Sequence, residues 1–301
     1  MADTATSAQP VRRASTEQDD AQAEQPGTGR SLLYHVLLCA ASIAMLYPLL
    51  WMLASSFKPD SDIFGSASLW PSSFSLEAYR RGWSGLQVPF GQFFLNSLVV
   101  SLSCVIGNVL SCSLTAYAFA RLTFRGQKLW FALMLGTLML PYHVTLIPQY
   151  VLFLNLGWVG TFLPLIVPKF LAADAFFIFL LVQFFRSIPR DLDEAAMIDG
   201  CGPLRIYWMV ILPLSLPALA TAAIFTFIWT WDDFFGPLVY LNDMNTYTVQ
   251  LGLRSFVDST GKSDWGALFA MSTLTLLPVL GFFLAFQRLL INGIATTGLK
   301  G

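Results

Sequence analysis

Charged residues are scarce in this chain. Asp, Glu, Lys and Arg make up 12% of its 301 residues, whereas the hydrophobic fraction is 55% and the mean hydropathy is +0.62. Charged residues make up about a quarter of a soluble domain, so this composition excludes an ordinary soluble domain and predicts a protein of the lipid bilayer. The net charge of −1 gives no reason to expect a clustered basic face, and nucleic acid is therefore not predicted as a partner.

Cysteine and histidine are too few and too scattered for a metal centre. The four cysteines show no paired short spacing, which argues against a zinc site and a disulfide framework, and the chain has only two histidines. One of these, His143, could hydrogen-bond a solute, although its apolar surroundings favour a packing role. We therefore predict no metal, no catalytic residues and no cofactor bound by this chain. We interpret the cysteines as small apolar packing residues: Cys39, Cys104, Cys112 and Cys201.

A nucleotide-binding loop is also missing. Gly261-Lys262-Ser263 matches the end of a P-loop, whose backbone amides hold phosphates, but Phe256 stands where the motif needs glycine. Any ATP hydrolysis is therefore expected in a different subunit.

Long apolar runs follow an N-terminal segment that has none. Residues 1–30 are rich in Ala, Gln, Ser and Thr, which predicts a disordered tail. The apolar run after it is longer than that of a signal peptide, so we expect it to remain as an anchor. A spanning helix needs about 20 mostly apolar residues. Six runs of that length predict an all-α, polytopic membrane protein with a six-helix domain over residues 31–291: Leu32–Ser55, Phe93–Ala118, Leu129–Tyr150, Phe162–Phe185, Leu214–Leu241 and Ala267–Leu290.

Prolines interrupt the third and fourth of these runs, at Pro141, Pro148, Pro164 and Pro168. Prolines at membrane depth are tolerated where neighbouring groups satisfy the freed backbone carbonyls. These two spans are therefore predicted to pack inside the helix bundle.

The distribution of Lys and Arg predicts the orientation in the membrane. If the N-terminus is cytoplasmic, most basic residues lie on the cytoplasmic side, and the positive-inside bias places both termini there. The residues inside are Arg12, Arg13, Arg30, Arg121, Arg125, Lys128, Arg186, Arg190, Arg205, Arg288 and Lys300, and those outside are Lys58, Arg80, Arg81, Arg254 and Lys262.

A polar segment, residues 186–213, separates the fourth run from the fifth and is predicted to be cytoplasmic. Acids between Asp191 and Glu194 precede a short apolar run, as at the start of a helix, where the positive end of the dipole favours negative charge. Gly200 and Gly202 end this helix, and Pro203 suits the first turn of a second one. These features alone fit an ordinary interfacial helix equally well.

The spacing in this segment resembles the EAA loop of permease subunits in ABC importers. Glu194-Ala195-Ala196 is followed by Gly200 and then by Val210-Ile211-Leu212-Pro213, with Val210 where the family pattern has isoleucine. Other stretches resemble the second permease of maltose-type transporters, in the carbohydrate-uptake branch. They are NSLVVSLSCVIGNVLSCSLTAYAFARLTFRG from Asn96, LPYHVTLIPQYVLFLNLGWVGT from Leu140 and NGIATTGLKG from Asn292.

This resemblance implies a coupling helix that docks on a cytoplasmic ATPase, with ATP and Mg²⁺ bound by that subunit. Glu194 would pair with a basic group of the ATPase, and Ala195 and Ala196 would give the helix a face with little side-chain bulk. Residues 292–301 would form a cytoplasmic tail that reaches the ATPase. The implied partners are a second permease of different sequence, two ATPase subunits, and an extracytoplasmic solute-binding protein that delivers a sugar. The predicted coupling residues are Glu194, Ala195, Ala196, Asp199, Gly200, Leu212 and Pro213.

Ionisable residues at membrane depth predict where a solute passes. Lys169 and Asp174 lie in the fourth run, and Asp232 and Asp233 follow two tryptophans in the fifth. Aromatic rings beside hydrogen-bonding acids suit a sugar. In the alternative interpretation Lys169 and Asp174 neutralise each other, and the two aspartates cap a helix near the outer end.

The outer loop from Asn242 to Trp265 is long and polar. We expect it to contact the solute-binding protein, because loops on rigid scaffolds commonly carry recognition, and a passive connector is the alternative. The predicted location is a bacterial-type cell membrane. Two other functions fit parts of the pattern. The first is an ion-coupled secondary transporter, which would usually show an internal repeat, and no clear repeat relates the first three spans to the last three. The second is an ABC permease for another polar solute, such as a glycerophosphodiester.

Overall fold

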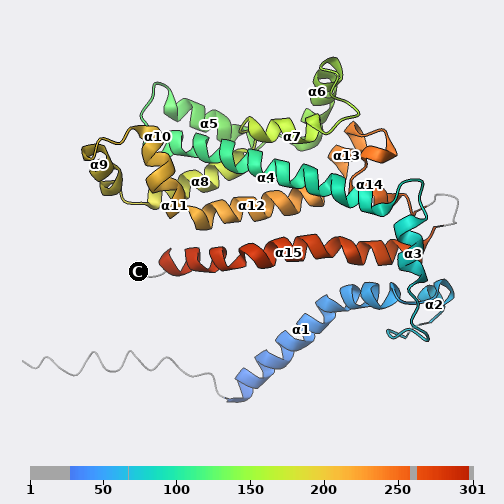
Figure 1. The fold of residues 1–301 in the computed structure, drawn as a ribbon. Helices are drawn as coiled ribbons and strands as arrows, with labels where there is room; N and C mark the ends of the chain where they lie inside the picture. The colour runs from blue at the N-terminus through green and yellow to red at the C-terminus, as the bar shows by residue number, and fades with distance from the viewer. Residues whose placement is uncertain (1–27, 67, 258–262, 298–301) are drawn as a thin grey trace, which may run out of the picture. The chain divides into compact units, whose positions relative to one another are not determined.

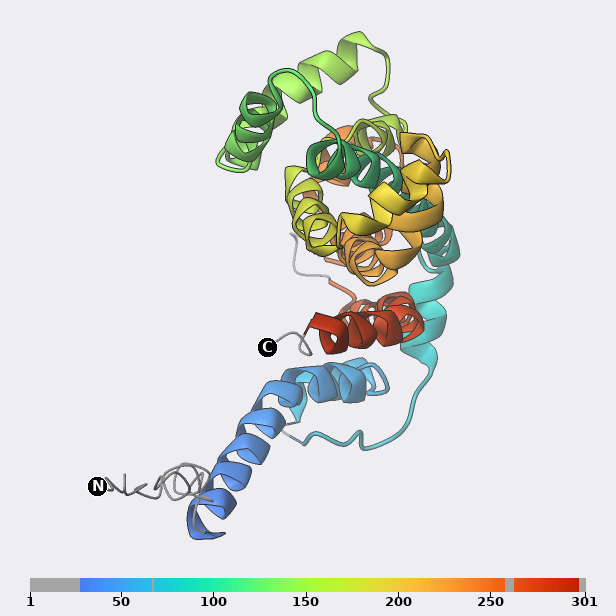
Figure 2. The same ribbon diagram turned by 90° about the vertical axis from the view of Figure 1, so that its left-hand side faces the viewer.

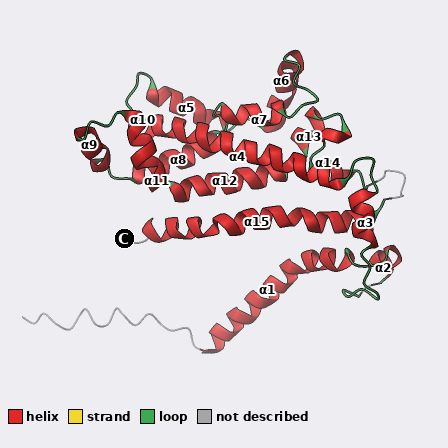
Figure 3. Ribbon diagram, viewed as in Figure 1, coloured by secondary structure: helices red, strands yellow, loops and turns green. Residues whose placement is uncertain are grey.

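The structure is a computed structural model that describes residues 28–66, 68–257 and 263–297, and the described part contains helices and loops but no strand (Figure 3). Most of the predicted N-terminal tail lies outside these residues. In chain order (Figure 1) the elements are α1 Thr28–Ser55, α2 Asp60–Gly65, α3 Glu77–Ser84, α4 Phe90–Arg121, α5 Gln127–Thr137, α6 Tyr142–Asn155, α7 Leu163–Phe170, α8 Ala175–Ser187, α9 Asp191–Ile198, α10 Pro203–Ile206, the π-helical η1 Tyr207–Ile211, α11 Leu212–Leu214, α12 Leu216–Trp231, α13 Phe235–Tyr240, the 3₁₀-helical η2 Met244–Thr246, α14 Val249–Arg254 and α15 Trp265–Thr297.

The chain divides into two compact units, residues 1–51 and residues 52–301, and the six-helix domain over residues 31–291 stays a prediction. The first unit holds most of α1. The apolar stretch of α1, Tyr34–Ser55, buries almost none of its side chains.

Four predicted spans are confirmed by helices that are long and apolar enough to cross a bilayer. They are Tyr34–Ser55, Phe90–Arg121, Leu163–Ser187 (α7 with α8) and Trp265–Leu289. The last of these helices continues to Thr297, into the segment expected as a C-terminal tail, and residues 298–301 lie outside the described residues.

The third predicted span is not one straight helix. α5 and α6 meet at an angle of 100° across residues 138–141, and α6 begins after Pro141. Proline disfavours helical backbone in the residue before it, so the helix ends at this point. The last carbonyls of α5 accept hydrogen bonds from the turn that follows, such as Leu138 N to Leu135 O at 3.1 Å, and need no neighbouring helix. Within this chain α5 buries no side chain and α6 buries only Phe153, so the prediction that this span packs inside the bundle was wrong.

The fifth predicted span is also divided. α12 ends at Trp231, well before the predicted boundary at Leu241, because the acidic pair that follows leaves the helix and α13 starts anew at Phe235. At its other end the stretch Pro203–Leu214 meets α12 at 78°. The continuous helix in this run is therefore shorter than the sequence predicted.

Helix α4 is the centre of the second unit and packs against α7, α8 and α12, while α15 packs on α12. Small and polar side chains of α4 allow this close packing, as in other membrane helix interfaces. Asn108 donates a buried hydrogen bond of 2.7 Å to Thr226 Oγ1 of α12. Gly107 faces the ring of Phe170, where a Cβ atom would lie 2.5 Å from a ring carbon.

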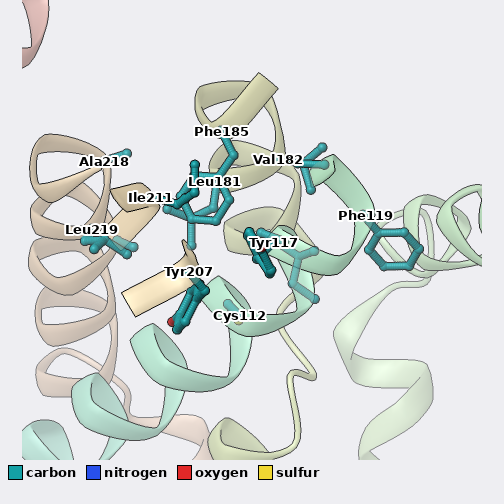
Figure 4. Close-up of a cluster of buried hydrophobic side chains, with 14 of the residues drawn as sticks. Cys112, Tyr117, Phe119, Leu181, Val182, Phe185, Tyr207, Ile211, Ala218 and Leu219 are labelled. Atoms are coloured by element: carbon teal, nitrogen blue, oxygen red, sulfur yellow. The ribbon is translucent and has the colours of Figure 1, made fainter. Parts of the chain in front are cut away.

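Two clusters of buried apolar side chains lie towards the two ends of α4. The first joins α4, α8, η1 and α12 and includes Tyr117, Phe185 and Tyr207 (Figure 4). The second joins α3, α4, α12, α14 and α15 and includes Phe90 and Trp231. Figure 1 shows α9 and α10 at one end of this unit and α3 and α14 at the other, and the α9 end faces the viewer in Figure 2.

Candidate functional site

The predicted short helix after α8 is confirmed as α9, Asp191–Ile198. Its first turn carries Asp191, Asp193 and Glu194, in line with the favourable interaction of acids with the N-terminal end of the helix dipole. The helix ends in a left-handed residue, Gly200, with φ of +80°. The amide of Cys201 closes the turn on Ala196 O at 2.9 Å, so the chain reverses at the glycine that the sequence indicated.

Exposed apolar side chains surround this turn, and sequence reasoning missed them. Met197 is 57% exposed, Ile198 is 87% exposed and Leu204 of α10 is 67% exposed. Glu194, Ala195 and Asp199 are also exposed, whereas Ala196 is half-buried against the first core cluster. The exposed surface of α9 is therefore bulkier and more apolar than the two alanines suggested. The signal was present in the sequence as large apolar residues within an otherwise polar loop.

The acid next to Glu194 points the other way. Asp193 is buried, and its Oδ2 lies 3.0 Å from Nη1 of Arg121, the last residue of α4. The Nη2 group of the same arginine donates to Phe185 O at 2.6 Å and to Ile188 O at 2.7 Å. α9 is thus joined to the ends of α4 and α8. This contact links residues far apart in sequence. Sequence reasoning identified Arg121 only as a basic residue of the cytoplasmic side and Asp193 only as an acid at the start of a helix, and it did not predict their pairing.

The second half of the segment is also fixed to α4. Pro203 begins α10 as predicted, and Tyr117 of α4 donates a hydrogen bond of 2.9 Å to its carbonyl oxygen. The chain then forms the π-helical turn η1, whose Tyr207 is fully buried in the first cluster (Figure 4). Leu212 is half-buried against that cluster and Pro213 is exposed in α11, where the chain turns towards α12.

A polar cavity of about 100 Å³ lies among α4, α7, α12, α13 and the residue that precedes α14. Of the four predicted pathway residues it brings Lys169 and Asp233 together, and Asp174 lies beside it as the ion-pair partner of Lys169, with Nζ 2.7 Å from Oδ2. Asp232 does not line the cavity and is exposed. The alternative interpretation also fits these contacts. Lys169 and Asp174 form an ion pair, and Asp233 Oδ1 accepts from Gly236 N at 3.1 Å and caps α13. The other residues that line the cavity are Ser97, Val100, Leu165, Trp229, Thr230, Pro237 and Thr248.

Hydroxyl groups in this cavity were missed from the sequence. Ser97 and Thr230 lie within apolar helices, and Thr248 precedes α14. Thr248 is buried, and its Oγ1 has no hydrogen-bond partner within the described residues. A solute with hydroxyl groups, or water, could satisfy this atom. Single serines and threonines are common in apolar runs, so the sequence does not show which of them meet in one cavity.

The loop at the α14 end is held to α4 by side-chain hydrogen bonds. Asn96 Nδ2 donates to Asn245 O at 2.8 Å and to Tyr247 O at 2.9 Å, and Val249 N donates to Ser97 Oγ at 2.8 Å. The predicted outer loop is thus a folded structure over its first part, whereas residues 258–262 lie outside the described residues.

Arg81 joins the segments next to this loop. Its guanidinium lies 2.7 Å from Asp60 and 3.0 Å from Asp264, at the start of α15. The hydrogen bonds to Asp264 raise the pKa of Arg81 above its usual value. The α3 end therefore carries an ion-pair network that fixes α2, α3 and α15 together.

The chain is similar to transport proteins over most of its length. The family described as "Binding-protein-dependent transport system inner membrane component" matches residues 107–296. The diacetylchitobiose uptake system permease protein NgcG of Streptomyces coelicolor is 35% identical, over 84% of each chain. The trehalose/maltose transport system permease protein MalG of Thermococcus litoralis is 33% identical, over 90% of this chain and 98% of that protein.

A relative with a different named solute and a solved structure are also similar to this chain. The sn-glycerol-3-phosphate transport system permease protein UgpE of Yersinia enterocolitica is 31% identical, over 88% of this chain and 96% of that protein. A solved bacterial ABC transporter involved in the import of the acidic polysaccharide alginate has a chain of the same fold. The TM-score is 0.76 with 23% identity, over 86% of this chain and 95% of that chain.

Proposed function

The chain belongs to the family of inner membrane components of binding-protein-dependent transport systems, and from this premise we propose that it forms one half of the translocation pathway of a sugar importer driven by ATP. Sugar as the solute is supported by the named substrates of two relatives, diacetylchitobiose and trehalose or maltose. The second candidate is a glycerol phosphate or its diester, which the relative UgpE favours.

The observation that carries this proposal is the exposed surface of α9 at one end of a helix bundle. In our proposal the coupling residues predicted from the sequence act together there. Glu194 pairs with a basic group of an ATPase subunit, and Met197 and Ile198 fill apolar pockets of its cleft, because exposed apolar side chains rimmed by polar ones suit a protein interface. Gly200 ends the helix so that this surface projects. Leu212 and Pro213 direct the chain from the coupling segment into α12.

The α9 end is then cytoplasmic, with both chain termini on the same side. The arginines and lysines near the ends of α4, α5 and α8 support this orientation through the positive-inside rule. ATP and Mg²⁺ bind to two ATPase subunits, and this chain supplies neither a nucleotide site nor a catalytic residue.

On the opposite side, the folded loop that precedes α15 contacts the solute-binding protein. Its support is the set of hydrogen bonds in which Asn96 Nδ2 donates to the loop and Ser97 Oγ accepts from it, and which hold the loop in a defined position on α4. A second permease of different sequence completes the pathway. The exposed apolar surfaces of α5 and α6 are available for that subunit.

The polar cavity lines part of the solute pathway in this proposal. Its ammonium, carboxylate and hydroxyl groups offer donors and acceptors for a polyhydroxylated solute, and Trp229 offers an aromatic face. Lys169 and Asp174 neutralise each other so that neither leaves an unpaired charge at membrane depth. Asp233 both caps α13 and accepts from the solute, and Asp232 lies at the outer margin.

The test is reconstitution of the chain with its second permease, ATPase and binding protein in liposomes. Glu194→Ala is expected to abolish both solute uptake and solute-stimulated ATP hydrolysis. Asp191→Ala, which removes another exposed acid from the same helix turn, is the matched control and should retain both. Full activity of Glu194→Ala contradicts the coupling role. Transport by this chain alone, driven by an ion gradient, would instead identify a secondary transporter. Competition by sugars against glycerol phosphates separates the two solute classes.

A further inference from the structure

Three helix ends meet at the side chain of Arg121. This arginine ends α4, α8 ends at Ser187 nearby, and α9 begins at Asp191. The side chain of Arg121 is 2% exposed and that of its partner Asp193 is 10% exposed. The ion pair therefore lies inside the protein, although both residues flank loops that sequence reasoning placed at the membrane surface.

The guanidinium is shared among all three elements. Nη1 pairs with Asp193 of α9, while Nη2 donates to the two carbonyls at the end of α8, Phe185 O and Ile188 O. Carbonyls at a helix C-terminus lack partners within the helix and carry partial negative charge, so a cation there is favourable. A second arginine completes the connection in the opposite direction, because Arg190 Nη2 donates to Ala120 O of α4 at 3.1 Å.

The pair is poorly arranged as a stabilising contact. Asp193 Oδ1 and Arg121 Nε are buried and have no hydrogen-bond partner within the described residues. Removing two charges from water is costly, and apolar side chains of similar volume often stabilise a protein as well or better. What apolar side chains cannot supply is the directional connection of one planar group, carried by α4, to a carboxylate of α9 and to two carbonyls at the end of α8. The geometry is therefore better explained by a role in positioning.

We propose that Arg121 and Asp193 are positioning residues for energy coupling, and that they lock α9 to the ends of α4 and α8 so that displacement of α9 moves both helices. This inference rests on the proposed function. It assigns separate tasks to two adjacent acids: Glu194, which is exposed, faces the partner, and Asp193, which is buried, faces the bundle.

The lock and the docking surface predict different defects. Loss of Glu194 removes docking, so the ATPase should separate from the permease. Loss of the Arg121–Asp193 pair leaves the exposed surface of α9 intact, so the ATPase should remain bound and hydrolyse ATP. Its movement would then be taken up by the short loops on either side of α9, and hydrolysis would continue with little transport.

The experiment uses the complete reconstituted complex with Arg121→Lys and Asp193→Asn. Three quantities are measured: ATPase retained on purification, basal ATP hydrolysis, and solute taken up per ATP hydrolysed. We expect retention and basal hydrolysis to stay at the wild-type level and uptake per ATP to fall about ten-fold, within the usual range of coupling between sites. Arg125→Lys, at an exposed arginine in the loop after α4, is the matched control and should change none of the three.

A double variant separates positioning from stability. Arg121→Met with Asp193→Leu leaves no unpaired buried charge, so the complex should form in normal amounts. Positioning predicts that this complex also transports about ten-fold less solute per ATP. Wild-type uptake per ATP in the double variant or in the two single variants, whatever their yield, overturns the inference while the proposed function stands. Absence of ATP-driven uptake in the wild-type complex overturns both.

Discussion

The phenolic oxygen of Tyr207 lies 2.7 Å from Ser113 Oγ, and both residues are fully buried. This hydrogen bond joins the π-helical turn after α10 to the central helix α4. The ring of Tyr207 also packs 5.3 Å from that of Tyr117, whose own hydroxyl holds Pro203 O. The segment after α9 is therefore fixed to α4 by a second set of contacts, separate from the Arg121–Asp193 pair.

Removing the Tyr207 hydroxyl should have a small effect, and removing its ring a large one. Tyr207→Phe keeps the ring in the first cluster and leaves Ser113 with its bond to Leu110 O, so about 1 kcal/mol of stability should be lost. Tyr207→Ala leaves a cavity and should cost about 3–5 kcal/mol. Thermal unfolding in detergent measures both, with Tyr34→Phe at an exposed tyrosine of α1 as the control. Similar losses for Phe and Ala would show that the hydroxyl dominates.

Replacing either Lys169 or Asp174 alone should destabilise the protein more than replacing both together. Lys169→Met leaves a carboxylate without its partner at membrane depth, and Asp174→Asn leaves the ammonium, both of which are costly. The double variant removes both charges, so it should retain more folded protein in the membrane than either single variant. Membrane protein level and uptake rate are compared across this cycle. If the three variants fall equally, the pair makes no contribution through mutual neutralisation.

Apolar runs, and the glycines and prolines between them, predicted where helices form better than they predicted the directions of those helices. The short helix α9 and the stop at Gly200 followed from acids, glycines and proline within one local stretch. The 100° turn between α5 and α6 did not follow, because Pro141 indicates a break and says nothing about the angle beyond it. Both halves are apolar, so composition could not separate one bent segment from one straight span.

Contacts between distant residues were likewise out of reach. Arg121 and Asp193 were visible only as two charges at opposite ends of different segments, and their pairing depends on how α4 and α8 pack. The cavity hydroxyls depend on the same packing. For the pathway, the predicted charges Lys169 and Asp233 do line one cavity, since a charge in an apolar run is rare enough to give a signal that a threonine does not.

Gly107 should not tolerate even a methyl group. A Cβ atom at this position would lie 2.5 Å from a ring carbon of Phe170, so the ring, or α7 that carries it, would have to move away from α4. Overpacking of this kind typically costs about 1–3 kcal/mol. Gly107→Ala should therefore lower the unfolding temperature of the purified protein. Gly136→Ala is the matched control, because a Cβ there meets nothing within 4 Å and alanine favours the helix, so stability should hold or rise. Equal effects at both positions would contradict the close approach of α4 and α7.

Alanine variants at Gly200 and Gly202 distinguish the effect of backbone conformation from the effect of available space. Among the described residues, no atom lies within 4 Å of a Cβ added at either position, so alanine would clash with none of them. Gly200 has φ of +80°, whereas Gly202 has φ of −74°, which any residue adopts. An L-residue in the left-handed region costs about 1–2 kcal/mol. Gly200→Ala should loosen the end of α9 and reduce uptake by the reconstituted complex, and Gly202→Ala should leave it near the wild-type rate. Equal loss in both variants would mean that the docking partner needs the open space at the two glycines, and that the left-handed turn is not what matters.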